Sequence, residues 1–352
     1  GLAIPGSVML IVSPGCCGRN TSEISSIPQY KNRFFYLEIS QTDLVTGAHL
    51  RKIPEAVNEI CRSLTKKPSV VMICATCVDA LLGTDFDRLC RSAEDLCGTE
   101  VRPCYMYALT REGIRPPMVQ VRQSLYSVLK KRERKADAVN LLGFFAPLDD
   151  DCELYTYLKK CGFNHLREIS RCRDYEEFQG MAEANINLVL FPEARNAAED
   201  LRKEHGMPSV ELTRMYRIEK IHNQYMALAS ILQTKIDDST EKERAEKAAA
   251  SFREKYPDLV FSIGECTNAD PFELALALVE YGFRVRSVYA SVQPGHFPAI
   301  DALARLSGET RVYCNQEPSM LFYEPEPDVD IAIGKDASWY YPERPSLPFC
   351  TD

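Results

Sequence analysis

The sequence lacks the motifs that carry several common enzyme chemistries. It contains no G-x-x-x-x-G-K-[ST] run, so the chain has no Walker loop of its own. No G-x-G-x-x-G follows an expected strand, which disfavours a dinucleotide site. H-E-x-x-H and G-x-S-x-G are also absent, so zinc-protease and serine-hydrolase chemistry have little support.

Long apolar runs and an excess of positive charge are missing as well. No stretch of about 18 apolar residues exists, so no membrane-spanning helix is expected. The formal net charge of -8 argues against nucleic acid and anionic membranes as main partners. No basic region precedes the first apolar run, which predicts no signal peptide and a cytoplasmic protein.

Cysteine, by contrast, is abundant, with 14 residues in a chain of 352. A disulfide-stabilised secreted domain is normally much shorter, so most of these thiols are expected to be reduced. Cys61, Cys90 and Cys97 lie on expected helices, where a thiol packs as a small hydrophobic group.

Two short apolar runs lead directly into cysteine-bearing turns. The run at residues 7–12 precedes SPGCCG at residues 13–18, and the run at residues 69–73 precedes CATC at residues 74–77. An expected helix at Ile53–Leu64 lies between them, which predicts two strands that are parallel neighbours.

The thiols of these turns are candidate metal ligands. Ligands of open parallel sheets lie beyond the carboxyl ends of the strands, so Cys16, Cys17, Cys74 and Cys77 are expected at one edge. Soft thiolates in one place favour zinc or an iron–sulfur cluster. The alternative is that two of the four are core cysteines and the C-x-x-C pair is fortuitous.

Strands alternate with helices along the whole chain, which predicts an α/β protein with mainly parallel sheets. We expect three Rossmann-like domains, at residues 1–135, 136–256 and 257–352, of which the first carries the cysteine-bearing turns. The second includes a charged, exposed connecting helix at residues 239–256. The second and third domains open with the same unit, in which a strand, Gly143 or Gly264, a loop and a helix follow one another.

The cysteine-bearing turns resemble those of the component-1 family of nitrogenase-type oxidoreductases. This family includes the nitrogenase molybdenum–iron protein subunits and the dark-operative protochlorophyllide reductases. Its first cluster cysteine follows a strand in a G-P-x-G-C turn, which residues 13–17 resemble with Cys17 at the ligand position. Its second follows the next parallel strand before L-I-G-D-D, which residues 77–85 resemble with Cys77. The similarity continues through residues 186–189, 205–208 and 259–264 and so covers most of the chain.

The resemblance implies an iron–sulfur protein that receives electrons from a separate, ATP-hydrolysing iron protein. Cys17 and Cys77 from each of two subunits would hold one [4Fe–4S] cluster across a two-fold axis. With Cys16 and Cys74 added, each chain would hold its own cluster or a larger one like the nitrogenase P-cluster. The partner subunit would be a second copy of the chain or a paralogue.

The chain departs from the family pattern at two points. Phe191 stands where nitrogenase has a cysteine that binds the catalytic cofactor, and the cofactor histidine would fall around or beyond Asp352. We therefore expect no molybdenum-type cofactor in this chain. A further cluster cysteine of the family would fall before Gly1.

Candidate proton donors lie in the last of the expected domains. Glu265 and Cys266 follow a strand end, where a thiol beside a carboxylate can supply protons during reduction. The alternative is a plain helix-start loop, with Asn268 or Asp270 as the cap. His296 is a further candidate donor, with a surface-loop histidine as the alternative.

Three functions remain open from the sequence. The first is an ATP-dependent reductase of an unsaturated or tetrapyrrole-like substrate. The second is a scaffold that holds a maturing iron–sulfur cluster for transfer, as some family members do. The third is a zinc-stabilised Rossmann-type binding protein that uses Cys74 and Cys77.

Overall fold

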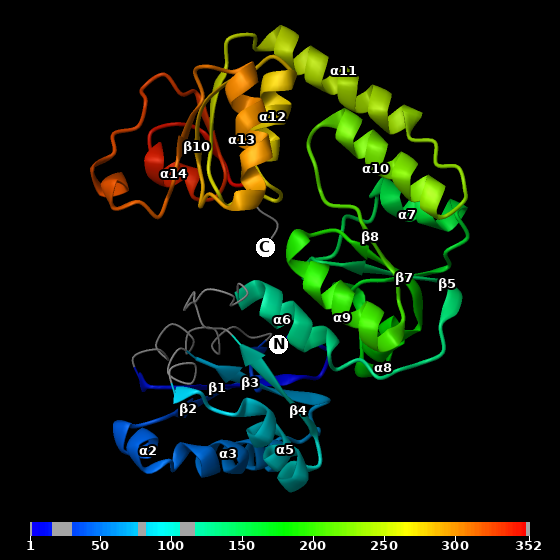
Figure 1. Ribbon diagram of the computed structural model, residues 1–352, viewed down its shortest axis with the longest axis vertical. Coiled ribbons are helices and arrows are strands. Elements are labelled where there is room, and N and C mark those ends of the chain that lie inside the picture. The colour runs from blue at the N-terminus through cyan, green and yellow to red at the C-terminus, as the bar shows by residue number, and fades with distance from the viewer. Residues whose placement is uncertain (1, 16–29, 77–81, 106–116, 350–352) are drawn as a thin grey trace. The chain divides into compact units, whose positions relative to one another are not determined.

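A computed structural model describes residues 2–15, 30–76, 82–105 and 117–349 of the chain (Figure 1). The chain divides into two compact units, Gly1–Glu211 and Leu212–Asp352. The described residues form two four-stranded sheets and one five-stranded sheet, and every strand pair is parallel. The predicted α/β class with parallel sheets is thus confirmed, whereas the three domain boundaries stay a prediction.

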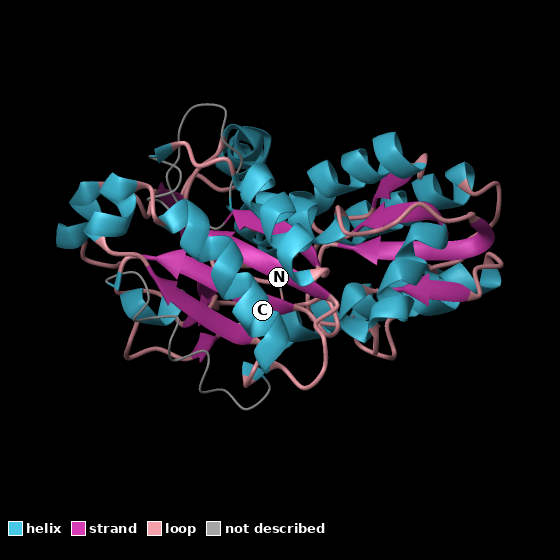
Figure 2. Cartoon of the chain, turned by 90° about the horizontal axis from the view of Figure 1, so that it is seen from below, coloured by secondary structure: helices cyan, strands magenta, loops and turns pink. Residues whose placement is uncertain are grey.

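The first sheet has the strand order β2-β1-β3-β4. Its strands are β1 (Val8–Ser13), β2 (Phe34–Glu38), β3 (Val70–Ala75) and β4 (Glu100–Tyr105), and the helices between them are α2 (Gln41–Thr46), α3 (His49–Ser63) and α5 (Phe86–Cys97). Every residue of β1 is buried, because helices cover both faces of this sheet (Figure 1). Figure 2 shows the helices and strands of the chain from below. Residues of α3 and α5 pack on one face, and residues of α6 (Pro117–Tyr126) pack on the other.

The second sheet has the order β6-β5-β7-β8. Its strands are β5 (Lys135–Leu142), β6 (His165–Arg167), β7 (Ala184–Val189) and β8 (Ser209–Glu211), and its helices are α7 (Glu153–Lys160), α8 (Tyr175–Gln179) and α9 (Arg195–His205). One apolar cluster includes Met72 of the first sheet, Leu125 of α6 and Leu142 of the second sheet. The two sheets of the first unit therefore share a core, with α6 between them.

The second unit contains the third sheet, in the order β11-β10-β9-β12-β13. Its strands are β9 (Val260–Ile263), β10 (Arg284–Tyr289), β11 (Arg311–Tyr313), β12 (Ile331–Ile333) and β13 (Ser346–Leu347), and its helices are α10 (Ile218–Ile231), α11 (Ser239–Lys255), α12 (Pro271–Glu280), α13 (Phe297–Leu306) and α14 (Ala337–Tyr340). No residue of α11 is buried, which confirms the exposed connecting helix predicted from its charge.

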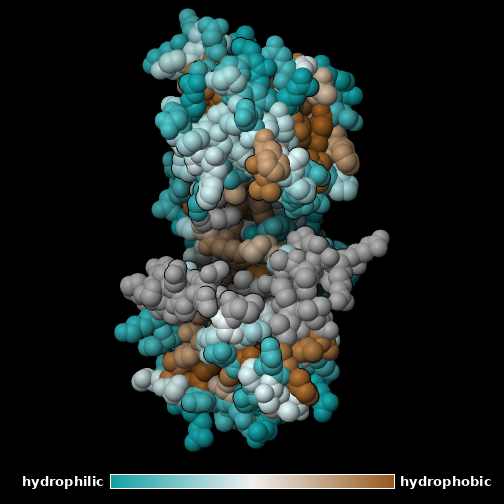
Figure 3. All heavy atoms as spheres, turned by 90° about the vertical axis from the view of Figure 1, so that its left-hand side faces the viewer, coloured by the Kyte–Doolittle hydropathy of each residue, from teal (hydrophilic) through white to brown (hydrophobic). Residues whose placement is uncertain are grey.

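The surface view shows mainly hydrophilic side chains with separate apolar patches (Figure 3). The large apolar side chains with the greatest exposure are Val45 in the first unit and Leu321, Phe322 and Trp339 in the second. Among the described helices, none combines the length and the apolar character that crossing a bilayer requires.

Candidate functional site

The carboxyl ends of β1 and β3 form the edge at which the sequence places its cluster. The two strands are neighbours, and Ile11 of β1 is in register with Cys74 of β3. Both strands run in the same direction, so the segments that follow Ser13 and Ala75 leave the sheet at one edge. The topology that the sequence predicted for this edge is therefore present.

A tyrosine of the neighbouring strand fixes the backbone at the end of β1. The hydroxyl of Tyr36 in β2 donates to the carbonyl oxygens of Ser13 and Pro14, at 3.1 and 2.8 Å, just before Gly15. A Cβ on Gly15 would lie 2.8 Å from Oε1 of Glu38, so glycine lets the chain pass close to that carboxylate. Cys16, Cys17 and Cys77 themselves lie outside the described residues.

Cys74 lies inside the core rather than in the loop beyond the strand. Its side chain is 3 % exposed and belongs to an apolar cluster with Met72 and Ile11. Cys104, its partner in the register with β4, is also buried, and burial raises the pKa of the Cys104 thiol. This environment is the one that the core-cysteine alternative predicts, because desolvation favours the neutral thiol over the thiolate that binds metal.

The described residues thus supply a frame for a cluster at this edge but not its ligand set. Within residues 2–15, 30–76, 82–105 and 117–349, no group of three or more His, Cys, Asp or Glu side chains could hold a metal ion. Cys17 and Cys77 follow β1 and β3 in the sequence, so their role as cluster ligands stays a prediction.

At the carboxyl end of the second sheet, a buried arginine fills the space beyond β5. Arg122 of α6 is 4 % exposed and donates to the carbonyl of Gly143 at 2.9 Å and to Glu193 at 2.6 Å. Its guanidinium lies 4.7 Å from the ring centre of Phe145 and 5.3 Å from that of Phe191. A cation between two aromatic rings closes this edge, and Phe191 is the residue that the sequence singled out there.

At the carboxyl end of the third sheet, a carboxylate fills the equivalent position. Asp336 follows β12 and accepts hydrogen bonds from the backbone N–H groups of Glu265 and Cys266, each at 2.8 Å. A Cβ on Gly264 would lie 2.3 Å from Oδ1 of Asp336, so the carboxylate packs directly against the glycine backbone. Two N–H groups that could receive an external anion are therefore occupied by the chain's own aspartate.

Glu265 is oriented by the neighbouring strands, and Cys266 beside it is exposed. The Glu265 carboxylate accepts hydrogen bonds from Ser291 at 3.1 Å and Asn315 at 3.0 Å. Asn315 in turn accepts a hydrogen bond from Tyr340 at 2.8 Å. The sequence missed Asp336, Ser291 and Asn315, although the strand-end rule that selected Glu265 also applies to the loop after β12.

Tyr340 connects this edge to a buried tyrosine cluster. The rings of Tyr340 and Tyr289 stack with centres 4.0 Å apart. The Tyr289 hydroxyl lies 2.8 Å from that of Tyr323 and 3.1 Å from that of Tyr341. Glu326 accepts hydrogen bonds from Tyr313, Tyr323 and Tyr341, so one carboxylate collects three phenol groups.

His296 lies in a helix-start environment. Its ring packs 5.0 Å from that of Phe272, and its Nε2 lies 3.6 Å from Oδ2 of Asp270. Asp270 accepts hydrogen bonds from the N–H groups of Phe272 and Glu273, which confirms it as the cap of α12. A role for His296, Glu265 or Cys266 in proton supply stays a prediction.

Comparison with known proteins identifies the family to which this chain belongs. The family model described as nitrogenase component 1 type oxidoreductase matches residues 1–349. The chain belongs to this family, which confirms the resemblance inferred from the cysteine-bearing turns.

Relatives in the family are cofactor-assembly proteins. The nitrogenase iron-molybdenum cofactor biosynthesis protein NifE of Clostridium pasteurianum is 25% identical over 230 residues, which is 63% of this chain and 49% of that protein. NifE of Nostoc sp. is 26% identical over 250 residues, which is 68% of this chain and 51% of that protein. The chain therefore spans about half the length of the curated relatives it matches.

A solved structure shows the same fold. The structure titled "Nitrogenase Cp1 at pH 6.5" superposes with a TM-score of 0.74 at 17% identity, over 99% of this chain and 83% of that one. At this identity the likeness shows the arrangement of sheets and helices, and no more.

Proposed function

We propose that this chain is part of a scaffold protein on which a complex iron–sulfur cofactor is assembled. The observation that carries the proposal is the similarity to NifE proteins, whose printed names describe iron–molybdenum cofactor biosynthesis. The frame at the β1–β3 edge supports it, because two adjacent parallel strands lead into Cys17 and Cys77.

In this proposal Cys17 and Cys77 hold the iron–sulfur group, with Cys16 as a further thiol donor beside Cys17. Cys74 acts as a core residue, since its side chain is buried among apolar neighbours. When bound, this iron–sulfur group would supply one-electron chemistry, or it would itself be the cofactor that the scaffold passes on. A [4Fe–4S] cluster shared with a second copy or a paralogous subunit needs two thiols from each chain.

A second candidate is the reductase, which the family description as an oxidoreductase favours. In that case a separate ATP-hydrolysing iron protein delivers electrons, and Glu265 and Cys266 supply protons to an unsaturated substrate. The carboxylate of Glu265 is already oriented by Ser291 and Asn315, as a positioned proton donor requires. The proposed setting is the cytoplasm, without nucleic acid or membrane partners.

Metal content tests the ligand assignment. Protein purified without oxygen is expected to contain iron and sulfide in similar amounts, and Cys17→Ala and Cys77→Ala are each expected to lose most of both. Cys90→Ala is the matched control, because Cys90 is a buried core thiol of α5. Full iron in both ligand variants, or zinc in place of iron, would contradict the proposal. Molybdenum measured in the same samples tests the expected absence of a molybdenum-type cofactor.

A transfer assay separates the two candidates. Loaded protein is mixed with an apo acceptor, and the iron in each protein is measured after they are separated. The scaffold proposal predicts that iron moves to the acceptor. It also predicts that no substrate is reduced when an added iron protein hydrolyses ATP. Iron retained through repeated ATP-dependent turnover would instead identify the reductase.

A further inference from the structure

A pocket lies at the amino ends of the first three strands, at the opposite edge of the first sheet from the carboxyl ends of β1 and β3. It has a volume of about 560 Å³ and lies wholly within the first unit. The segments before β1, β2, β3 and α8 line it. This volume falls within the range of about 300–1,000 Å³ that small-molecule sites occupy.

The charges that line this pocket differ from those of the chain as a whole. Although the chain carries a net charge of -8, the lining contains five cationic side chains and a single carboxylate. The cations are Lys31, Arg33, Lys66, Lys67 and Arg173, and the carboxylate is Asp174. Asp174 is engaged as the cap of α8, where it accepts a hydrogen bond from the N–H of Glu177 at 2.8 Å.

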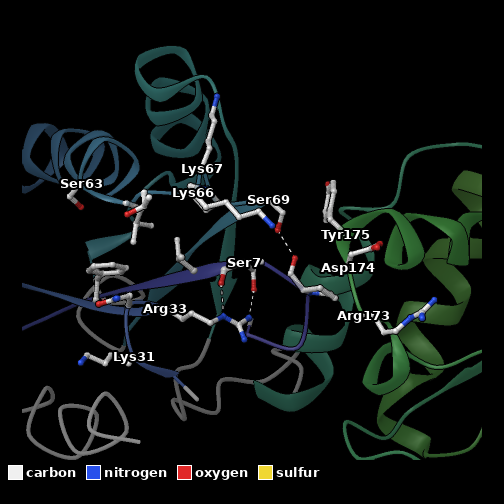
Figure 4. Close-up of a pocket in the computed structure, with 18 residues that line it drawn as sticks. Ser7, Lys31, Arg33, Ser63, Lys66, Lys67, Ser69, Arg173, Asp174 and Tyr175 are labelled. Atoms are coloured by element: carbon white, nitrogen blue, oxygen red, sulfur yellow. Dashed lines mark hydrogen bonds between the residues drawn. The ribbon is translucent and has the colours of Figure 1, made fainter. Parts of the chain in front are cut away.

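Two of the five cations are already used elsewhere. Lys67 donates to the carbonyl of Gly98 at 2.7 Å, and Arg173 pairs with Glu177. Figure 4 shows both side chains extending away from the centre, whereas Lys66 extends toward Ser69. Lys31 and Lys66 form no ion pair with any residue that the structure describes.

Arg33 forms a rigid cationic floor. Its Nε donates to the carbonyl of Ser7 at 3.0 Å, and its Nη2 donates to the carbonyls of Leu2 and Ile4 at 2.7 and 3.1 Å. These acceptors are neutral, and no carboxylate within the described residues pairs with Arg33. Burial lowers the pKa of Arg33 from its ordinary value. An anion beside this guanidinium would be bound by a group that is already ordered.

Helix α3 opposes an anion, because its carboxyl end at Ser63 reaches the pocket and carries a partial negative charge. This partial charge of about half a unit is smaller than the charge of Arg33 and Lys66 together. Phe35 and Tyr175 also line the pocket and pack against the apolar clusters on opposite faces of the sheet, so each adds an apolar wall on its own side.

We propose that this pocket binds a small organic phosphate, with Arg33 and Lys66 on the phosphate, Lys31 at the rim, and Phe35 and Tyr175 against the organic part. Nη1 of Arg33 forms no hydrogen bond with a described residue and is the donor left for a phosphate oxygen, since Nε and Nη2 are engaged by the backbone. The ammonium group of a lysine such as Lys66 is a common second partner of phosphate oxygens in proteins. The proposal is independent of the cluster, because its residues lie at the other edge of the sheet.

Calorimetric titration with phenyl phosphate tests the site. Phenyl phosphate is expected to bind saturably and more tightly than inorganic phosphate, because its ring can contact the apolar wall. Lys31→Ala/Lys66→Ala is expected to weaken binding about tenfold, since a hydrogen bond to a charged group contributes roughly that factor. Lys159→Ala/Lys220→Ala is the matched control, because it removes the same charge from two exposed lysines outside the pocket.

Three results would overturn the proposal. They are no saturable binding of phenyl phosphate, equal weakening in the two double variants, and equal affinity for phenyl phosphate and inorganic phosphate. Circular dichroism confirms that each variant is folded before it is titrated.

Discussion

The strand ends at Gly143 and Gly264 begin the same structural unit but are closed by different chemistry. After β5, Gly143 meets Phe191, and the buried Arg122 fills the remaining space between aromatic rings. After β9, Gly264 meets Asp336, whose carboxylate accepts two backbone hydrogen bonds. The same backbone unit can therefore be closed by different side chains, because these side chains come from other segments of the chain.

Adding a methyl group at each glycine should destabilise the two strand ends to different extents. In Gly143→Ala the new Cβ would lie 2.7 Å from both N and Cβ of Phe191, at a φ of +138°. We expect a loss of about 4 kcal/mol in the free energy of unfolding, because overpacking and backbone strain add. For Gly264→Ala we expect about 2 kcal/mol, because the obstacle is the end of the Asp336 side chain, which can rotate away at the cost of its hydrogen bonds, rather than backbone.

Urea denaturation followed by circular dichroism measures both losses. Gly295→Ala is the control, because no atom lies within 4 Å of a Cβ built there. A smaller loss for Gly143→Ala than for Gly264→Ala would contradict the expected difference between a backbone obstacle and a side-chain obstacle.

Removing the guanidinium tests whether the β5 edge depends on its cation. Arg122→Ala is expected to lower the free energy of unfolding by about 3 kcal/mol, because the Gly143 carbonyl and Glu193 lose a charged donor. Arg91→Ala, at an exposed position of α5, should change it by less than about 0.5 kcal/mol. Urea denaturation measures both losses. Equal losses in the two variants would show that the Arg122 guanidinium does not contribute to stability.

Removing the carboxylate tests the β9 edge. Asp336→Ala deletes the acceptor of two backbone N–H groups and is expected to cost about 2 kcal/mol, whereas Asp336→Asn keeps one acceptor oxygen and should cost less. Hydrogen exchange at Glu265 and Cys266 should accelerate in Asp336→Ala and remain slow in Asp301→Ala, an exposed aspartate of α13. Unchanged exchange would contradict the role of Asp336.

The smallest effect concerns pH and the tyrosine cluster behind the β9 edge. Burial alone would raise the pKa of Glu326, but hydrogen bonds from Tyr313 and Tyr323 hold this pKa below its ordinary value of 4.5. A depressed pKa in the folded state gives stabilisation that is present above about pH 4.5 and is lost as the pH falls below it. In Glu326→Gln the free energy of unfolding should therefore fall less as the pH is lowered below about 4.5. In Glu324→Gln it should fall as much as in the unaltered protein.

Much of the framework could be predicted from sequence, and the reason is local. The strands β1, β3, β5, β7 and β9 are short apolar runs bounded by turn residues, and such runs leave a direct signal. The β1–β3 adjacency followed from the crossover rule for parallel strands. By contrast, the charged run at residues 130–135 carries no such signal, and there α6 ends before the run, at Tyr126, while β5 begins at its last residue, Lys135.

The candidate site was only partly predictable, because its parts come from distant segments. Glu265 and Cys266 could be selected because they follow a strand, but Asn315 and Asp336 become their neighbours only when β11 and β12 join the sheet. Cys74 reads as part of a C-x-x-C pair, yet the pleat of β3 turns its side chain into the core beside Met72. The cluster ligands Cys17 and Cys77 stay a prediction.

The α/β class, the order of most elements and the family can be recognised from the sequence, since these depend on periodicity and on motifs within short stretches. How each sheet edge is closed, and which cations line the pocket at the amino ends of the strands, emerges only when the chain is folded. The physical reason is that hydrogen bonds, ring contacts and charge clustering act over a few ångströms in space between residues that can lie 70 positions apart, as Asp336 and Cys266 do.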